Sequence, residues 1–287
     1  MWNLCDLKGL LVRICHLIAE KDYVSAMDGN VSVRLSDGTF LCTPTMIHKA
    51  FITEADLLVV DARGQKLYGA PDRAPTSEIH MHLAAYACRP DVHAVVHAHP
   101  PTAIAFTLAG ETLARCVLPE VVLTLGQIPT APYATTGTHA LADIVGALIA
   151  THDALLLERH GAICVGRDLI DAFGKLEKVE HTALITLRAR MLGRARTLDC
   201  DEVTHLRDLG QKYSSNGRPP PMCEDCGGCP TQRPWQDAPS FSMGRVVFSD
   251  AVSASRRAPA TSSTPDSTGW ELKRLVTDEI LRTLDGR

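Results

Sequence analysis

The segment VVHAHPP, residues 95–101, contains two histidines at alternate positions just before a pair of prolines. An apolar run that ends at prolines predicts a β-strand that terminates there. Side chains at alternate positions of a strand project from the same face, so we expect the imidazoles of His97 and His99 to lie together. Two imidazoles on one face provide half of a divalent metal site.

A third nitrogen ligand would have to come from another part of the chain, and His160 is the best candidate. The segment DALLLERHGAICVG, residues 153–166, predicts two strands joined by a turn at His160-Gly161. A histidine in that turn would lie at an edge of the sheet. The chain has 12 histidines, so spacing alone also permits ordinary core or surface histidines here.

A second candidate site is the segment PTSEIHMH, residues 75–82, which predicts the start of a helix with Ser77 as its N-cap. The hydroxyls of Thr76 and Ser77 and the free N–H groups of a helix start suit a phosphate. The carboxylate of Glu78, if it lies beside a metal, can bind the metal or move a proton. The alternative is a plain N-cap followed by a glutamate that favours the helix dipole.

The remaining segments indicate one α/β domain over residues 1–212. Apolar residues at helical spacing predict helices in residues 1–20, 77–89, 101–110, 138–153 and 168–193. Short β-rich runs punctuated by Gly, Asp and Pro predict strands in residues 29–35, 39–44 and 56–64. Residues 121–126 (VVLTLG) and 128–133 (IPTAPY) are also expected to be extended.

Six short motifs together carry a family resemblance. GNVS, CTPT followed by Lys49, PTSE, HAHPP, APYATTGT and RHG, in this order and at these separations, resemble the class II aldolase/adducin family, and within it the fuculose-phosphate-type aldolases. The resemblance covers roughly residues 5–195. It implies a three-layer α/β/α sandwich around a mainly antiparallel sheet, and a homotetramer with its sites between subunits.

The resemblance also implies a metal site and a phosphate site. Zinc would be held by His97, His99, His160 and Glu78, and Glu78 would become the acid/base when substrate displaces it; manganese or cobalt could replace zinc. The positions that match phosphate-holding residues of the family are Gly29, Asn30, Thr45, Met46, Thr76 and Ser77. Met46 stands where many members have glycine, which leaves its backbone contact open.

The reaction implied by the resemblance is metal-dependent retro-aldol cleavage. L-fuculose 1-phosphate or L-rhamnulose 1-phosphate would give dihydroxyacetone phosphate and lactaldehyde, which makes the protein an aldehyde-lyase. A tyrosine that many aldolases use near residues 118–120 has no match in Leu118-Pro119-Glu120, and Glu120 is the substitute proton donor that we consider. Which sugar is cleaved cannot be deduced from the sequence.

Two other functions of the same family stay open. Pentulose-phosphate 4-epimerases break and re-form the same kind of bond, but they typically have aspartate where this chain has Glu78. Adducin-like proteins without catalysis lose the metal histidines, whereas this chain keeps all three.

Composition limits the partners and the compartment. The 287 residues are 45% hydrophobic and carry a net charge of -4, which excludes a collagen-like, wholly disordered or disulfide-scaffold chain. This mild acidity gives no reason to expect nucleic acid or an anionic membrane as partner. No segment reaches the roughly 18 apolar residues of a membrane span, and none resembles a signal peptide. Isolated cysteines among apolar residues indicate reduced thiols and a cytoplasmic location.

The composition changes after about Tyr213. Residues 213–268 contain eight of the 17 prolines and predict a flexible linker. Cys223, Cys226 and Cys229, with Cys200 upstream, suit either a metal knuckle or an unused thiol cluster, and their role stays open.

The last segment, residues 269–287, has apolar residues at helical spacing and predicts an amphipathic helix. WELKRLVTDEILRTL resembles the encapsulation peptides that recruit enzymes into bacterial microcompartments. A shell protein is therefore an expected partner, and the microcompartment lumen the expected place of the enzyme. Alternatively, this helix packs on its own tetramer.

Overall fold

The structure is a computed structural model that describes residues 4–210. The predicted linker 213–268, its cysteine cluster and the predicted helix 269–287 lie outside the described residues. Within residues 4–210, no helix is long and apolar enough to cross a membrane.

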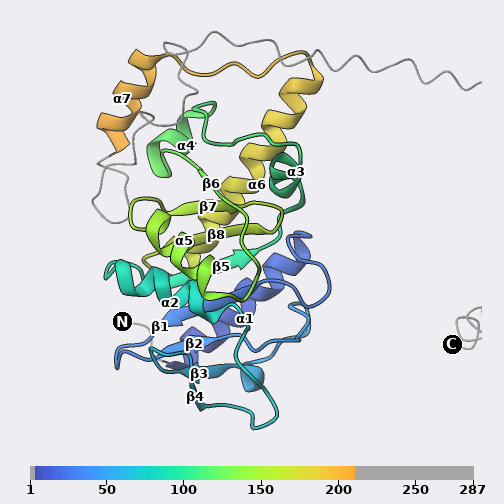
Figure 1. Cartoon of the computed structure of the whole chain (residues 1–287), viewed down its shortest axis with the longest axis vertical. Coiled ribbons are helices and arrows are strands. Elements are labelled where there is room, and N and C mark those ends of the chain that lie inside the picture. Colours follow the sequence, from blue (N-terminus) through green and yellow to red (C-terminus); the bar gives the residue numbers. More distant parts are fainter. Residues whose placement is uncertain (1–3, 211–287) are drawn as a thin grey trace, which may run out of the picture. The chain divides into compact units, whose positions relative to one another are not determined.

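A single sheet of eight strands organises the described part, in the order β4-β3-β2-β1-β5-β8-β7-β6 (Figure 1). Every neighbouring pair is antiparallel except β6 and β7. The strands are β1 (Asn30–Arg34), β2 (Phe40–Cys42), β3 (Leu58–Val60), β4 (Lys66–Tyr68), β5 (Ala94–Ala98), β6 (Thr130–Ala131), β7 (Ala154–Leu157) and β8 (Gly161–Gly166).

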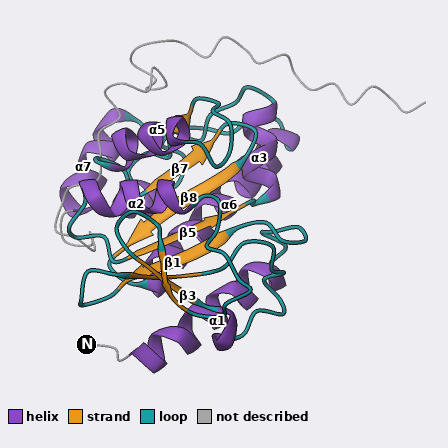
Figure 2. Ribbon diagram, turned by 60° about the horizontal axis from the view of Figure 1, so that its bottom comes forward, coloured by secondary structure: helices purple, strands orange, loops and turns teal. Residues whose placement is uncertain are grey.

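Helices cover both faces of the sheet (Figure 2). They are α1 (Leu4–Glu20), α2 (Ile79–Cys88), α3 (Pro101–Leu108), α4 (Pro119–Thr124), α5 (His139–Ile149), α6 (Leu169–Met191) and α7 (Cys200–Gly210), with a 3₁₀ turn at Glu54–Asp56. The core on one face contains residues of α1, α3 and α6, and the core on the other contains residues of α2 and α5. The predicted three-layer α/β/α fold is therefore confirmed.

The alternation along the central strands decides which side chains face which layer. On β1, Val31 and Val33 pack in the core of α1, α3 and α6, so Asn30 and Ser32 face the layer of α2. On β5, Val95 belongs to the α2 and α5 core, and His97 shares its face. Two polar residues and a histidine thus lie against α2, on a sheet that is otherwise mostly apolar there.

Most predicted helices form where the apolar spacing places them, but the extended structure expected for residues 121–126 is wrong. Residues 119–124 form the short helix α4. Pro119 occupies the first turn, where its fixed φ favours a helix. Val121 and Val122 are both buried from that helix, so packing overrides the strand preference of the two valines.

The N-cap expected for helix α2, Ser77, is also wrong. Helix α2 begins at Ile79, and Glu78 occupies the cap without a side-chain cap hydrogen bond. The Oγ1 atom of Thr76 accepts from the Glu78 N–H at 3.3 Å, so Thr76 takes over part of the capping task. This arrangement leaves the Glu78 carboxylate free for other contacts. Asp168, by contrast, caps α6 as its position suggests, accepting from the Asp171 N–H.

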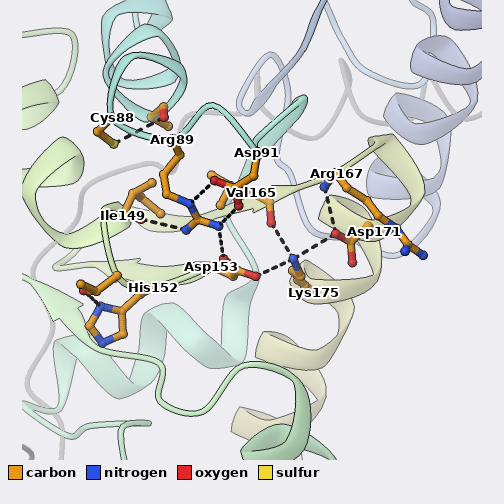
Figure 3. A network of polar contacts seen from close by, with 12 residues as sticks. Cys88, Arg89, Asp91, Ile149, His152, Asp153, Val165, Arg167, Asp171 and Lys175 are labelled. Atoms are coloured by element: carbon orange, nitrogen blue, oxygen red, sulfur yellow. Dashed lines mark hydrogen bonds and ion pairs between the residues drawn. The ribbon is translucent and has the colours of Figure 1, made fainter. Parts of the chain in front are cut away.

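A buried ionic network ties α2, β7, β8 and α6 together (Figure 3). The guanidinium of Arg89 binds Asp91 and Asp153, at 2.6 and 3.0 Å. The ammonium of Lys175 binds Asp153 and Asp171, at 2.7 and 3.0 Å. Asp153 stands just before β7, and Lys175 also donates to the carbonyl oxygen of residue 165 near the end of β8. The network therefore lies at the opposite end of these strands from the turn that contains His160.

Candidate metal centre

The structure brings three histidines together where β5 ends and β8 begins. His97 is the penultimate residue of β5, His99 follows the strand, and His160 precedes β8. One ring nitrogen from each lies within 4.8 Å of the others. The Nε2 atoms of His97 and His99 are 3.1 Å apart. Only His97 is within the strand, so the pair does not arise from strand alternation alone.

Hydrogen bonds at the outer nitrogens direct the inner nitrogens of the rings toward one another. The Nδ1 atom of His97 lies 2.9 Å from the Ala162 carbonyl oxygen. A carbonyl only accepts, so Nδ1–H donates and the Nε2 lone pair of a neutral His97 is bare. The Nδ1 atom of His99 lies 3.3 Å from a carboxylate oxygen of Asp28, with the same consequence for its Nε2. Such outer partners are typical of metal-binding histidines.

The donor set fits a divalent metal. Two bare lone pairs 3.1 Å apart repel each other unless a cation or proton lies between them. Burial lowers the pKa of His99 to about 3, and the neighbouring imidazoles of His97 and His160 lower it further. Its ring is therefore neutral at physiological pH, as a metal ligand must be.

Glu78 completes the cluster. Its Oε2 atom is 3.3 Å from Nε2 of His97, and its Oε1 atom is 3.1 Å from Nε2 of His160. Asn30 donates from Nδ2 to the same Oε2 atom at 2.8 Å. Burial by itself would raise the pKa of Glu78, but the charges and hydrogen bonds of His97 and His160 hold it well below its usual range. The carboxylate is ionised beside the three imidazoles.

Gly161 allows this close approach. A Cβ atom at that position would lie 2.4 Å from the Ala98 carbonyl oxygen and 2.9 Å from Cδ2 of His99. It would also lie 3.1 Å from Cε1 of His97. The sequence Arg-His-Gly therefore has a physical reason: the residue after His160 has to be glycine for the three rings to meet.

The loops expected to hold phosphate lie side by side. The N–H of Thr45 donates to the Ala74 carbonyl oxygen at 2.9 Å, and Pro44 and Pro75 form an isolated β-bridge. Thr45 and Met46 are therefore close to the turn that contains Thr76 and Ser77. Met46 has a φ of 56°, in the left-handed region where glycine is preferred, which accounts for the glycine of many relatives.

Gly29 lies at the edge of the cluster. With a φ of 73°, it approaches β5 so closely that a Cβ atom would be 3.0 Å from the His97 carbonyl oxygen. Its neighbour Asn30 is opposite His97 in the β1–β5 ladder. The carboxamide of Asn30 is engaged at both ends within the protein, with Glu78 and with His82. Its expected contact with phosphate stays a prediction.

Glu120 has surroundings of a different kind. It is exposed in the first turn of α4. Burial lowers the pKa of Lys178 on α6, and the charge of Glu120 partly opposes this shift. Among residues 4–210, Glu120 forms no hydrogen bond or ion pair with the histidines, so its role as proton donor stays a prediction.

Two charged residues near the histidines had no role assigned from the sequence, although one of them, Lys49, belongs to the second motif. Asp28 contacts His99, as described above. Lys49 is only 1% exposed, and its Nζ donates to the carbonyl oxygens of Met27 and Ile47, at 3.2 and 2.9 Å. It thereby ties the loop before Gly29 to the loop after Met46. The only sequence signal for Lys49 was its place just after the CTPT motif.

Comparison with known proteins agrees with this geometry. The sequence model of the Class II Aldolase and Adducin N-terminal domain matches residues 9–187. An L-fuculose phosphate aldolase of Methanococcus vannielii is 36% identical over 178 residues, which are 62% of this chain and 93% of the relative. A 3-oxo-tetronate 4-phosphate decarboxylase of Escherichia coli is 32% identical over 208 residues, 70% of this chain and 95% of the relative.

A solved structure of an aldolase is also similar to this chain. The L-fuculose-1-phosphate aldolase of Thermus thermophilus aligns with a TM-score of 0.58 and 30% identity, over 67% of this chain and 98% of that chain. Both comparisons concern the part of the chain that contains the histidine cluster.

Proposed function

The chain belongs to the class II aldolase and adducin family, and we propose that it cleaves a ketose 1-phosphate into dihydroxyacetone phosphate and an aldehyde. The proposed substrates are L-fuculose 1-phosphate or L-rhamnulose 1-phosphate, and the proposed aldehyde is lactaldehyde. Family membership supports a lyase. The observation that carries the proposal is the contact of an ionised Glu78 with His97 and His160, at 3.3 and 3.1 Å.

The residues that would hold the metal are His97, His99 and His160, with Glu78 as a fourth ligand before substrate binds. We propose zinc, because a small set of imidazole and carboxylate ligands would suit that ion. When bound, the metal supplies Lewis-acid polarisation of the substrate carbonyl. The hydrogen bond of His97 to the Ala162 carbonyl and the contact of His99 with the Asp28 carboxylate, at 3.3 Å, hold the rings in orientation.

Glu78 moves the proton. Cleavage between C3 and C4 leaves the bonding electron pair on C3 of the phosphate-bearing fragment. The C4 hydroxyl releases a proton as it becomes the aldehyde, and C3 has to receive one. Because Glu78 is ionised, it takes up a proton from solvent before it delivers one to C3. Glu78 is 11% exposed and lies against the imidazoles, so it can reach the substrate without being open to bulk water. A well-placed carboxyl group typically contributes about 10²–10⁴-fold to the rate. Glu120 remains our proposal for the group that exchanges a proton with the aldehyde oxygen.

The phosphate would lie between the loops at Gly29, Thr45, Met46, Thr76 and Ser77. Backbone N–H groups beside a glycine and at the start of α2 suit an anion. Ser77 is exposed at this helix start, so its hydroxyl is available to a ligand. Phosphate binding at one end of the substrate would orient the reacting carbons at the other.

Decarboxylation is the second candidate, and two observations favour it. One relative, matched over 95% of its own length, is a 3-oxo-tetronate 4-phosphate decarboxylase. In addition, residues 118–120 hold no tyrosine to serve a departing aldehyde. Loss of CO₂ from such a 3-oxo acid also places an electron pair on the carbon beside the carbonyl, where Glu78 would again supply the proton. The CO₂ that leaves needs no proton transfer to its oxygens.

The test is a direct comparison of substrates with the full chain loaded with zinc. We expect dihydroxyacetone phosphate and lactaldehyde in equal amounts from one of the two ketose 1-phosphates. CO₂ release from 3-oxo-tetronate 4-phosphate, with no cleavage of either ketose, would replace the aldolase by the decarboxylase. Interconversion of pentulose phosphates alone would show an epimerase, and activity that survives complete chelation would refute the metal site.

A homotetramer with sites between subunits is part of the proposal. Met46 and Phe51, near the candidate phosphate loop, are 68% and 76% exposed, and such apolar side chains suit burial by a second copy. Light scattering of the purified chain would give the mass of the assembly directly. A monomer at micromolar concentration would refute the tetramer.

We also propose that residues 269–287 dock on a microcompartment shell protein and that residues 213–268 tether them to the enzyme domain of residues 1–212. The support is the apolar stripe in the sequence of the terminal segment and the surplus of proline before it. A short amphipathic helix gains most of its stability from a partner.

A further inference from the structure

Glu78 and four side chains behind it form a continuous series of hydrogen bonds between β1 and α2. Tyr86 Oη lies 2.8 Å from Ser32 Oγ, which lies 2.7 Å from His82 Nδ1. His82 Nε2 lies 2.6 Å from Asn30 Oδ1, and Asn30 Nδ2 lies 2.8 Å from Glu78 Oε2. Alternate residues of the strand therefore interleave with residues four apart on the helix.

These hydrogen-bonded side chains are buried at positions where apolar side chains would stabilise the fold equally well. Ser32 and His82 are 0% exposed, and Asn30 and Tyr86 are 4% and 3% exposed. Each polar atom removed from water costs free energy unless it is paired. Ser32 lies between two buried valines of its strand, Val31 and Val33, and His82 lies on a mainly apolar helix. Packing alone does not call for these polar residues.

The donors and acceptors of the chain have one consistent direction. Carboxylate Oε2 of Glu78 only accepts, so Asn30 presents its NH₂ group to Glu78 and its Oδ1 to His82. Oδ1 accepts from Nε2–H of His82. Burial lowers the pKa of His82 to about 3, with a further contribution from His97, so the ring is neutral and Nδ1 is an acceptor. Ser32 therefore donates to Nδ1 and accepts from the Tyr86 hydroxyl.

All four donated hydrogens thus point toward Glu78. Hydrogen bonds in such a series polarise one another, which strengthens the last bond to the carboxylate. They also fix the Asn30 amide, because a reversed amide would place two donors against each other at His82. One oxygen of Glu78 is held in this way, while the other faces His160.

We propose that His82 is a positioning residue: through Asn30 it holds the Glu78 carboxylate against the histidine cluster in the orientation that metal binding and proton transfer require. The inference rests on the proposed role of Glu78. It gives Asn30 a task within the protein, besides its expected place near the phosphate.

The test compares His82→Leu with His82→Gln in the full chain. Leucine removes the donor to Asn30, whereas the glutamine amide can replace Nε2–H. We expect His82→Leu to lower kcat and zinc affinity by roughly 10–100-fold, with little change in KM, and His82→Gln to recover most of both. His80→Leu is the matched control, because His80 lies on the same helix but its ring contacts the ring of His139 in a tilted arrangement.

Metal binding separates this inference from the proposed function. Zinc affinity, from competition with a chromophoric chelator, and the visible spectrum of the cobalt-loaded protein need no substrate. If no substrate is turned over but His82→Leu still weakens zinc and alters the cobalt spectrum, the proposed function fails and the positioning role stands. Wild-type zinc affinity and kcat in His82→Leu would overturn the positioning role.

A second variant covers the case in which His82→Leu does not fold. Tyr86→Phe keeps the ring that stacks on Phe40 at 4.7 Å and removes only the hydroxyl at the far end of the chain. Ser32 can still donate to His82, so we expect a smaller loss, about two- to fivefold in kcat, from the weaker polarisation. An unchanged kcat and zinc affinity in Tyr86→Phe would then overturn the proposal.

Discussion

Replacing Gly161 with alanine should damage the histidine cluster and the sheet together. The new methyl group would lie 2.4 Å from the Ala98 carbonyl oxygen, which belongs to the backbone of β5. That atom cannot rotate away as the end of a flexible side chain can. Either β5 and β8 separate, or His97 and His99 move with the strand.

The magnitude follows from which atoms must shift. Overpacking a well-packed site costs about 1–3 kcal/mol, and a clash with the backbone in the central β5–β8 pair favours the upper part, about 2–3 kcal/mol. The rings of His97 and His99, 3.1 and 2.9 Å from the new methyl, must move by several tenths of an ångström or more. Displacing supported metal ligands typically weakens affinity by roughly 10–100-fold.

The assay measures both effects with one matched control. Urea unfolding of the metal-free protein gives the free energy of unfolding, and competition with a chelator gives the zinc affinity. Gly174→Ala is the control: it lies within α6 and a Cβ atom there meets nothing within 4 Å. Alanine should stabilise that helix by about 0.5–1 kcal/mol and leave zinc affinity unchanged. If Gly161→Ala behaves like Gly174→Ala in both measurements, the close approach at the cluster is wrong.

Four further predictions use other parts of the structure. Glu78→Gln should reduce product formation by about 10²–10⁴-fold while unfolding as the wild type does; full activity would remove Glu78 from the reaction. Lys175→Met should cost about 3–5 kcal/mol of stability, because it leaves Asp153 and Asp171 without their ammonium partner, and zinc affinity should stay the same since the network lies at the other end of the strands. The pKa of His82 falls from 6.5 to about 3 on folding. Between these values the unfolded chain binds a proton that the folded chain does not, so the free energy of unfolding falls as pH falls, by up to about 1.4 kcal/mol per pH unit. The free energy of unfolding of His82→Gln should lack this contribution, and the same dependence on pH in both proteins would contradict the prediction. Deleting residues 269–287 should leave activity intact and abolish co-purification with shell proteins, whereas lost activity with retained shell association would contradict the docking role.

Periodicity and turn residues were sufficient to predict most of the helices and strands, whereas the three layers were implied by the family resemblance. The apolar spacing in residues 1–20 and 138–153 predicts α1 and α5, and Asp168 marks the start of α6 as a capping residue should. The same reasoning failed for residues 121–126, where two valines suggested a strand. Their burial from a proline-initiated turn of helix is a tertiary effect that a local pattern does not contain.

The histidine pair was predicted from spacing, but the hydrogen bonds that link Ser32 and His82 to Asn30 were not. Ser32 and His82 are 50 residues apart, and their contact depends on α2 packing against β1. No local pattern indicates which strand a helix will cover. Once the helices and strands are known, the sequence does contain a signal for these hydrogen bonds. Glu78, His82 and Tyr86 lie four residues apart on one helical face, opposite Asn30 and Ser32. Polar residues repeating at the period of a buried face indicate a network.

The two polar systems of the sheet differ in a way that separates stability from chemistry. Around Arg89 and Lys175, two cations contact three carboxylates, of which Asp153 is shared, so every charged group of the network has a partner within the protein. At the other end, the Nε2 atoms of His97 and His99 lie 3.1 Å apart, and the two carboxylate oxygens of Glu78 lie 3.3 and 3.1 Å from Nε2 of His97 and of His160. Nitrogen and oxygen donors converge there, and a divalent cation would fit among them. The series of hydrogen bonds from Tyr86 to Glu78 contributes only hydrogen-bond donors of the protein, so it holds Glu78 in place but does not supply a cation.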